Sequence, residues 1–174
     1  ARPVASYVAV SAGGIHTLAI KSDGTLWAWG DNSSGQIGTG CSDSSCFYLS
    51  TLTQVTTDTD WASTSAGGFF TTAIKIDGTL WGWGDNYAGQ LGDGCSPMSS
   101  CVSKATPTKI GTDADWASVA AGANHVIALK TNGTLWSWGI NDYGQLGNGT
   151  NSPTAYGSVP VQIGTDTDWK TITV

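Results

Sequence analysis

Four cysteines in two closely spaced pairs are the residues of this chain best suited to covalent or metal chemistry. Cys41 and Cys46 stand five positions apart, and Cys95 and Cys101 stand six positions apart. Each pair directly follows a Gly-Gln-(Ile/Leu)-Gly-Xaa-Gly stretch, and the third copy of that stretch, at 144–149, lacks both cysteines. The two cysteines are thus present together or absent together, and no histidine stands at the same place. This favours a disulfide within each loop over a metal site. Two disulfides predict an oxidising, extracellular compartment.

Three pairs of aspartates are a second set of candidate ligands. In each pair the carboxylates are two positions apart and directly precede a tryptophan: Asp58 and Asp60, Asp113 and Asp115, Asp166 and Asp168. Such carboxylates could contribute to the six to eight oxygen ligands of Ca²⁺. Aspartate in a turn of this kind more often bonds its own backbone, so turn capping is the favoured interpretation. We predict no metal and no cofactor.

The two histidines favour packing over catalysis. His16 and His125 occupy equivalent places in a repeated sequence, and Phe70 stands at that place in the second copy. Phenylalanine neither transfers a proton nor binds a metal, whereas a packing position accepts it. No Ser/His/Asp or Cys/His set has a spacing that indicates a nucleophile, and a lyase or glycosidase would need a paired-acid site that the sequence does not show. We therefore predict that the chain is not an enzyme.

These residues recur because the chain repeats itself three times. The segment at 23–32, Asp-Gly-Thr-Leu-Trp-Ala-Trp-Gly-Asp-Asn, returns with small changes at 77–86 and 132–141, at intervals of 54 and 55 residues. A repeat of this length is typical of propellers, solenoids and arrays.

Each unit is predicted to form four short strands. In the first unit an aromatic-led strand at 7–10 and a strand at 16–21 precede an Asp-Gly pair, which is a strong hairpin signal. A Thr-Leu-Trp-Xaa-Trp-Gly strand, apolar on both faces, comes next, and a shorter strand at 53–55 ends the unit. Four antiparallel strands covered on both faces describe a β-propeller blade, so the fold class is all-β. We expect blade units at 7–60, 61–115 and 116–168, with an extra first strand at 169–174.

The composition limits the partners. Of 174 residues only 11% are charged, the net charge is -6, and nine tryptophans require burial. A negative net charge argues against nucleic acid or an anionic membrane surface as a partner. No segment approaches the ~20 apolar residues that cross a membrane.

The repeated run is also specific to one family. In the first copy it extends from 13 to 38 and includes Gly-Gly-Xaa-His-Thr-Xaa-Ala-Ile-Lys-Xaa-Asp-Gly-Thr-Leu-Trp-Xaa-Trp-Gly. The run resembles the regulator-of-chromosome-condensation repeat, particularly its bacterial secreted versions, over essentially the whole chain. The resemblance implies units of seven-bladed propellers. Known members include a nuclear exchange factor for a small GTPase and bacterial inhibitors of β-lactamases, but fold does not imply function.

Candidate interaction residues lie where the repeats differ. Those segments are 42–52, 96–106 and 150–158, and loops on a rigid scaffold often hold binding specificity. They carry aromatic and sulfur-containing residues of the kind enriched at interfaces, namely Phe47, Tyr48, Met98 and Tyr156. The alternative is that these segments only cap the blade edge.

Three repeats are too few to close a propeller, because known propellers have about four to eight blades. The extra strand supplies three further candidate interaction residues, Trp169, Ile172 and Val174. We predict a secreted module for self-assembly or protein binding, a homo-oligomer in which blades are completed between subunits as a ring or a head-to-tail filament. The alternatives are a secreted inhibitor or ligand-binding propeller, and a fragment of a longer seven-bladed propeller.

Overall fold

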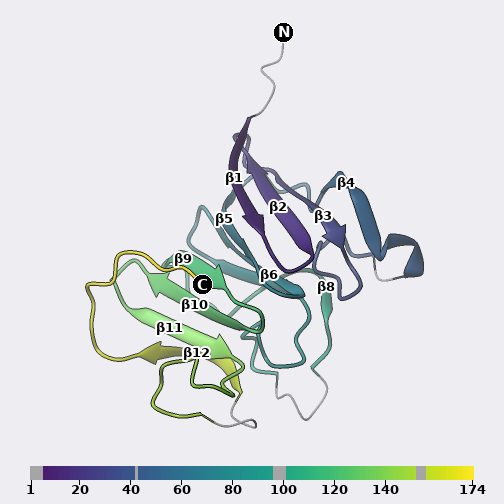
Figure 1. The fold of residues 1–174 in the computed structure, drawn as a ribbon. Coiled ribbons are helices and arrows are strands. Elements are labelled where there is room, and N and C mark those ends of the chain that lie inside the picture. Colours follow the sequence, from purple (N-terminus) through teal and green to yellow (C-terminus); the bar gives the residue numbers. More distant parts are fainter. Residues whose placement is uncertain (1–5, 42, 96–100, 152–155) are drawn as a thin grey trace.

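Three four-stranded antiparallel sheets make up the fold, as predicted. A computed structural model describes residues 6–41, 43–95, 101–151 and 156–174 of the chain (Figure 1). Blade 1 contains four strands in the order β1-β2-β3-β4: β1 (Tyr7–Ala12), β2 (His16–Lys21), β3 (Leu26–Asp31) and β4 (Tyr48–Gln54). A short 3₁₀ helix, η1 (Ser44–Cys46), precedes β4.

The second and third sheets have the same order. Blade 2 contains β5 (Trp61–Ala66), β6 (Phe70–Lys75), β7 (Leu80–Gly84) and β8 (Lys104–Lys109). Blade 3 contains β9 (Trp116–Ala121), β10 (His125–Lys130), β11 (Leu135–Gly139) and β12 (Gly157–Ile163). The blades follow one another in chain order, with β5 packed on β1 and β2, and β9 packed on β5 and β6 (Figure 1).

The Asp-Gly turn forms the hairpin between the second and third strands of a blade. In blade 1 the Asp23 carboxylate accepts hydrogen bonds from the backbone N–H and hydroxyl of Thr25, at 3.1 and 2.6 Å. The Thr25 hydroxyl in turn accepts the indole N–H of Trp27 at 2.9 Å. Gly24 has a φ of +77°, and a Cβ there would lie 1.9 Å from the carbonyl oxygen of Thr59 on the connection to blade 2. Only glycine permits both this conformation and this approach.

Most of the core lies between blades rather than within them. Trp83 of blade 2 and Trp138 of blade 3 are 0% exposed. The indole N–H of Trp83 donates to the carbonyl oxygen of Gln36 in blade 1, and that of Trp138 donates to the carbonyl oxygen of Gln90 in blade 2, both at 2.9 Å. Blades 2 and 3 are therefore each packed on, and hydrogen-bonded to, the blade before them.

The fourth strand is longer than the sequence predicts. β4 begins at Tyr48, whereas the prediction placed this strand at 53–55. The ladder with β3 is irregular between Ala28 and Gly30 and then resumes, pairing Gly30 with Leu49 and Asp31 with Tyr48. Because an irregular ladder breaks the alternation of side chains, the sequence pattern does not reveal the start of the strand. The segment 42–52, expected to be a loop, therefore ends within β4.

The stretch 169–174 lies across blade 3 but pairs with no described strand. A Cβ at Gly133 would lie 2.0 Å from the carbonyl oxygen of Thr167, just as Gly24 in blade 1 approaches Thr59. Val174 lies against Gly122 at the other end of the blade. The stretch thus occupies on blade 3 the place that β5 occupies on blade 1, without the neighbouring strand that would complete a ladder.

Candidate functional site: the open blade faces and their polar contacts

A lysine enclosed by two tryptophans and two aspartates joins the first strand of blade 2 to the rest of the blade. The ammonium of Lys75 lies 4.8 Å from the ring centroids of both Trp61 and Trp81. It also lies 2.7 Å from a carboxylate oxygen of Asp58 and 3.0 Å from one of Asp60. Burial acts to lower the pKa of Lys75, but its contacts with the two carboxylates outweigh burial and raise the pKa above the usual value.

The same site recurs in blade 3. Lys130 lies 4.9 and 4.7 Å from the centroids of Trp116 and Trp136, and it forms ion pairs with Asp113 and Asp115. These contacts correct the favoured interpretation of the aspartate pairs. Asp58, Asp60 and their counterparts in blade 3 bind a lysine 15 or 17 residues further along rather than capping their own turns.

Sequence reasoning missed these sites because the lysine and its aspartates lie in different segments of the unit. A signal was present, since the lysine ends the second strand in every copy, at Lys21, Lys75 and Lys130. The Asp-Xaa-Asp-aromatic pattern accompanies it in the second and third copies.

Blade 1 holds only part of this site. Lys21 lies 3.7 Å from the centroid of Trp27 and 5.5 Å from that of Tyr7, and it forms no ion pair with any described residue. In the sequence Val4 and Ser6 stand where blade 2 has its two aspartates. Lys21 therefore has the aromatic contacts of Lys75 without its carboxylates.

The complementary part follows blade 3. Asp166, Asp168 and Trp169 repeat the Asp-Xaa-Asp-Trp pattern, and all three are exposed. Neither aspartate forms an ion pair within the described residues. Trp169 is 44% exposed, whereas its counterparts Trp61 and Trp116 are 2% and 4% exposed.

His16 forms a polar contact between blades 1 and 2, consistent with a packing role. Its Nε2 lies 2.9 Å from the hydroxyl oxygen of Thr71, and that hydroxyl donates to the carbonyl oxygen of Gln36 at 2.9 Å. The Thr71 oxygen therefore accepts a hydrogen bond from Nε2–H of the neutral ring. Burial lowers the pKa of His16 to about 4, against a weaker opposing effect of Asp31.

The next interface uses an apolar pair at the same positions. Phe70 of blade 2 and Val126 of blade 3 stand where His16 and Thr71 stand one interface earlier, and both belong to one buried cluster. Blade 3 carries a histidine again, His125, which is partly buried and whose pKa is lowered by burial.

The face of blade 1 that points away from blade 2 is incompletely covered. Trp29 aligns with Trp83 and Trp138, but it is only partly buried, and its indole N–H meets no acceptor among the described residues. Tyr7, which aligns with Trp61, is 51% exposed.

A glutamine in the turn after the third strand bonds the backbone of its own repeat in all three copies. The side-chain oxygen of Gln36 accepts the backbone N–H of Ser34 at 2.9 Å, and Gln90 accepts that of Ala88 at 2.8 Å. Gln145 does the same for Tyr143 at 2.9 Å.

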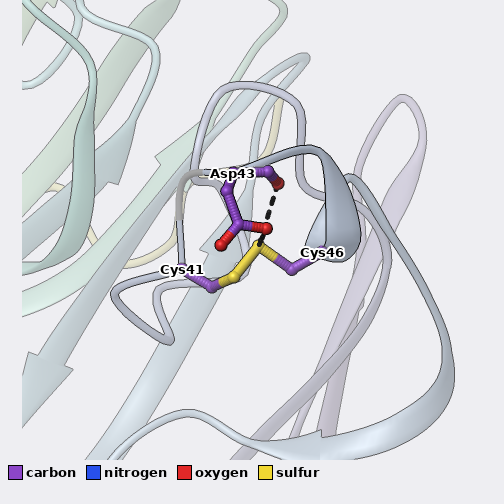
Figure 2. A group of neighbouring side chains, drawn as sticks. All are labelled: Cys41, Asp43 and Cys46. Carbon is purple, nitrogen blue, oxygen red and sulfur yellow. Dashed lines mark hydrogen bonds between the residues drawn. A yellow bond between two sulfur atoms is a disulfide. The ribbon is translucent and has the colours of Figure 1, made fainter.

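The structure joins Cys41 to Cys46 and Cys95 to Cys101 in disulfide bonds, as predicted. Asp43 lies beside the first disulfide (Figure 2). Its carboxylate accepts the backbone N–H of Ser45 at 2.8 Å, at the start of η1. Because the two sulfurs are bonded to each other, this group offers a cation one carboxylate and no thiolate.

The other candidate interaction residues are spread over the molecule. Tyr48 is 76% exposed and, with Ile15 and Leu49, lines a mostly apolar hollow of 380 Å³ at the edge of blade 1. Phe47 and Tyr156 are partly buried. Ile172 is partly buried and Val174 is 57% exposed. Met98 lies outside the described residues, as do 96, 97, 99 and 100.

Within the described ranges, no helix is long and apolar enough to cross a membrane.

Comparison with known proteins gives relatives that are much longer than this chain. The X-linked retinitis pigmentosa GTPase regulator homolog of Caenorhabditis elegans is 32% identical over 90% of this chain and 11% of its own length. The mitochondrial RCC1 domain-containing protein RUG3 of Arabidopsis thaliana is 35% identical over 80% of this chain and 32% of its own length. The chain thus spans a third or less of these relatives.

Solved structures share the fold. Prp20p from Saccharomyces cerevisiae superposes with a TM-score of 0.78 at 24% identity, over 90% of this chain and 38% of that one. Human WBSCR16 superposes with a TM-score of 0.76 at 22% identity, over 91% of this chain and 39% of that one.

The family comparison agrees with the repeats read from the sequence. The pattern described as Regulator of chromosome condensation (RCC1) repeat matches at 23–74, 77–129 and 132–174, and a second pattern of that description matches at 7–36, 61–90 and 116–145. Together with the three four-stranded sheets, these matches show that the chain belongs to the RCC1 repeat family of β-propellers.

Proposed function

We propose that this chain is a non-enzymatic, extracellular protein-interaction module that associates with further copies of itself through the open faces of blades 1 and 3. The observation that carries the proposal is the environment of Trp29. Its counterparts Trp83 and Trp138 are fully buried and donate to a carbonyl oxygen of the preceding blade, whereas Trp29 is only partly buried and its indole N–H has no acceptor among the described residues. An aromatic ring with an unused donor at its tip suits an interface.

The relatives support protein binding as the general role. The solved structure of Prp20p concerns its binding to Gsp1p and histones, and another shows yeast RCC1 (Prp20) bound by Kap60. These partners belong to the yeast protein. They support a protein-binding role for this chain because the yeast protein that binds them contains a propeller of the same fold.

The two disulfides support an extracellular location. Each closes a short loop at the same place in its repeat. Disulfides of this kind form and persist in oxidising compartments and are rare in reducing ones.

Sedimentation of the 174-residue chain over a range of concentrations tests the association. We expect species heavier than the 17.9 kDa monomer. Trp29→Ala should weaken association by about tenfold or more, because buried aromatic anchors dominate interface energies. Tyr48→Ala, at an exposed aromatic outside the blade faces, serves as the matched control and should leave the mass unchanged. A monomer at every concentration would exclude this function.

A second candidate is the binding of a different protein, as an inhibitor or ligand-binding propeller would do. The apolar hollow beside Tyr48, Ile15 and Leu49 favours it, because exposed apolar patches often mark interaction sites. In that case the chain would bind its partner as a monomer. Tyr48→Ala would lower the affinity for that partner, and Trp29→Ala would leave it unchanged.

A further inference from the structure

We infer that the copies join head to tail by exchanging a strand: residues 169–174 of one copy replace β1 in blade 1 of the next copy, and the rest of that blade packs on blade 3. This inference rests on the proposed self-association and specifies which residues meet. Three separate complementarities between the free face of blade 3 and that of blade 1 support it.

The first is electrostatic. Among the described residues Lys21 has its aromatic contacts but forms no ion pair, and Asp166 and Asp168 form no ion pair with a lysine. In blade 2 the first strand and the connection before it bring Trp61, Asp58 and Asp60 to Lys75. A strand formed by 169–174 would bring Trp169 and the two aspartates to Lys21 of the next copy in the same way. Opposite charges at matching positions fix both partner and register.

The second is the histidine and threonine pair. Blades 1 and 2 meet through His16 and Thr71, and blades 2 and 3 meet through Phe70 and Val126. The free face of blade 3 carries His125, and the free face of blade 1 carries Thr17 at the position of Thr71. Packing blade 1 on blade 3 therefore repeats the polar pair and avoids placing a histidine against a valine.

The third is the indole hydrogen bond. Trp83 and Trp138 each donate to the backbone carbonyl of the glutamine in the preceding repeat. Trp29 is the corresponding donor on blade 1, and the carbonyl of Gln145 is the corresponding acceptor on blade 3, where no described indole reaches it. Docking would satisfy both groups at once.

Exchange, rather than docking with β1 in place, follows from where 169–174 lies. This stretch and the residues just before it already cross blade 3 at the place of an incoming first strand, with Thr167 against Gly133 and Val174 against Gly122. Two first strands cannot occupy that place. β1 is itself poorly covered, because Tyr7 and Val10 are 51% and 64% exposed. Strand addition of this kind is a recurrent mode of protein recognition.

A charge swap tests the partner residues. Lys21→Glu alone, and Asp166→Lys with Asp168→Lys, should each weaken association by about tenfold or more, since like charges would face each other in every junction. Mixing the two variants should restore assembly to near the unmodified level. Where the two variants alternate, every junction joins opposite charges. It pairs either the introduced glutamate with the introduced lysines or the original Lys21 with the original aspartates. Failure of the mixture to recover would overturn this pairing.

A disulfide trap tests the exchange itself. In the exchanged strand Ile172 would stand opposite Ala19 of the next copy, as Thr64 stands opposite Ala73 in blade 2 and Val10 opposite Ala19 in blade 1. Ile172→Cys with Ala19→Cys should therefore form a covalent link between copies, detected by mass spectrometry. Val10→Cys with Ala19→Cys is the matched control, which links β1 to β2 within one copy.

The outcomes separate this inference from the proposed function. A link between copies only in the first variant supports exchange. Assembled material in which only the control variant links shows that β1 stays in place, so exchange is wrong while self-association stands. A chain that remains monomeric overturns both.

Discussion

The buried polar contacts of single residues make stability depend on pH. His16 lies 3% exposed, bonded through Nε2 to Thr71, with Nδ1 unpartnered within the described residues. Burial lowers its pKa from 6.5 to about 4. Between these values the unfolded chain takes up a proton that the folded chain does not, so folded-state stability falls as the pH falls from 6.5 to 4.

We expect this histidine to remove roughly 2–3 kcal/mol of the free energy of unfolding between pH 6.5 and 4, since one pKa unit corresponds to about 1.4 kcal/mol. Urea denaturation at several pH values measures the loss. The double variant His16→Phe with Thr71→Val copies the pair at Phe70 and Val126 and should lose less over the same range. An equal loss in that variant would show that His16 is not the responsible group.

Lys75 gives a prediction that does not depend on pH. Lys75→Met should lower the free energy of unfolding by about 1–2 kcal/mol, because it removes two cation–π contacts and two ion pairs with half-exposed aspartates. Lys109→Met, at an exposed position on β8, should change stability by less than about 0.5 kcal/mol. Thermal or urea denaturation of both variants decides the comparison, and equal effects would contradict the structural role of Lys75.

At the scale of the element, the hairpin turns set how closely two blades approach. Gly24→Ala adds a Cβ beside the carbonyl of Thr59 as well as the cost of a positive φ, and we expect a loss above about 2 kcal/mol. Gly149→Ala is the matched control, because Gly149 has a similar φ of +79° but nothing within 4 Å of the added atom. It should lose only about 1 kcal/mol. Similar losses in urea denaturation would mean that the blade contact adds little.

The bounds of a strand can be predicted from the sequence where neighbouring residues mark its ends. β2, β6 and β10 are each followed by an Asp-Gly or Asn-Gly turn, and the bounds predicted for the first of them, 16–21, are those of β2 in the structure. The beginning of β4 could not be predicted, because its pairing resumes after an irregularity that the side-chain pattern does not mark.

The site was less predictable than the fold for the same reason. The cysteine pairs are local, and their pairing was predicted. The hydrogen bonds that join blades connect residues far apart in the sequence. Thr71 and Gln36 are 35 residues apart, and Trp83 and Gln36 are 47 apart, so only the assembled fold shows that they meet.

At the scale of the whole molecule, the main contacts between described strands of different blades join blade 1 to blade 2 and blade 2 to blade 3, as in a linear array of repeats. Blade 2 packs against a described blade on both faces, whereas blades 1 and 3 each pack against a described blade on one face. Local opening should therefore be easiest in the outer blades of a single chain.

The indole bonds between blades give each interface its own spectroscopic reporter. The Nε1 protons of Trp83 and Trp138 are buried and bonded to carbonyl oxygens, so they should exchange slowly with deuterium. The Nε1 proton of Trp29, without an acceptor in the described chain, should exchange fast in dilute solution. If a neighbouring blade covers it, its exchange should slow toward that of the other two as protein concentration rises. One indole resonance would then follow the closing of a junction while two others in the same spectrum serve as references.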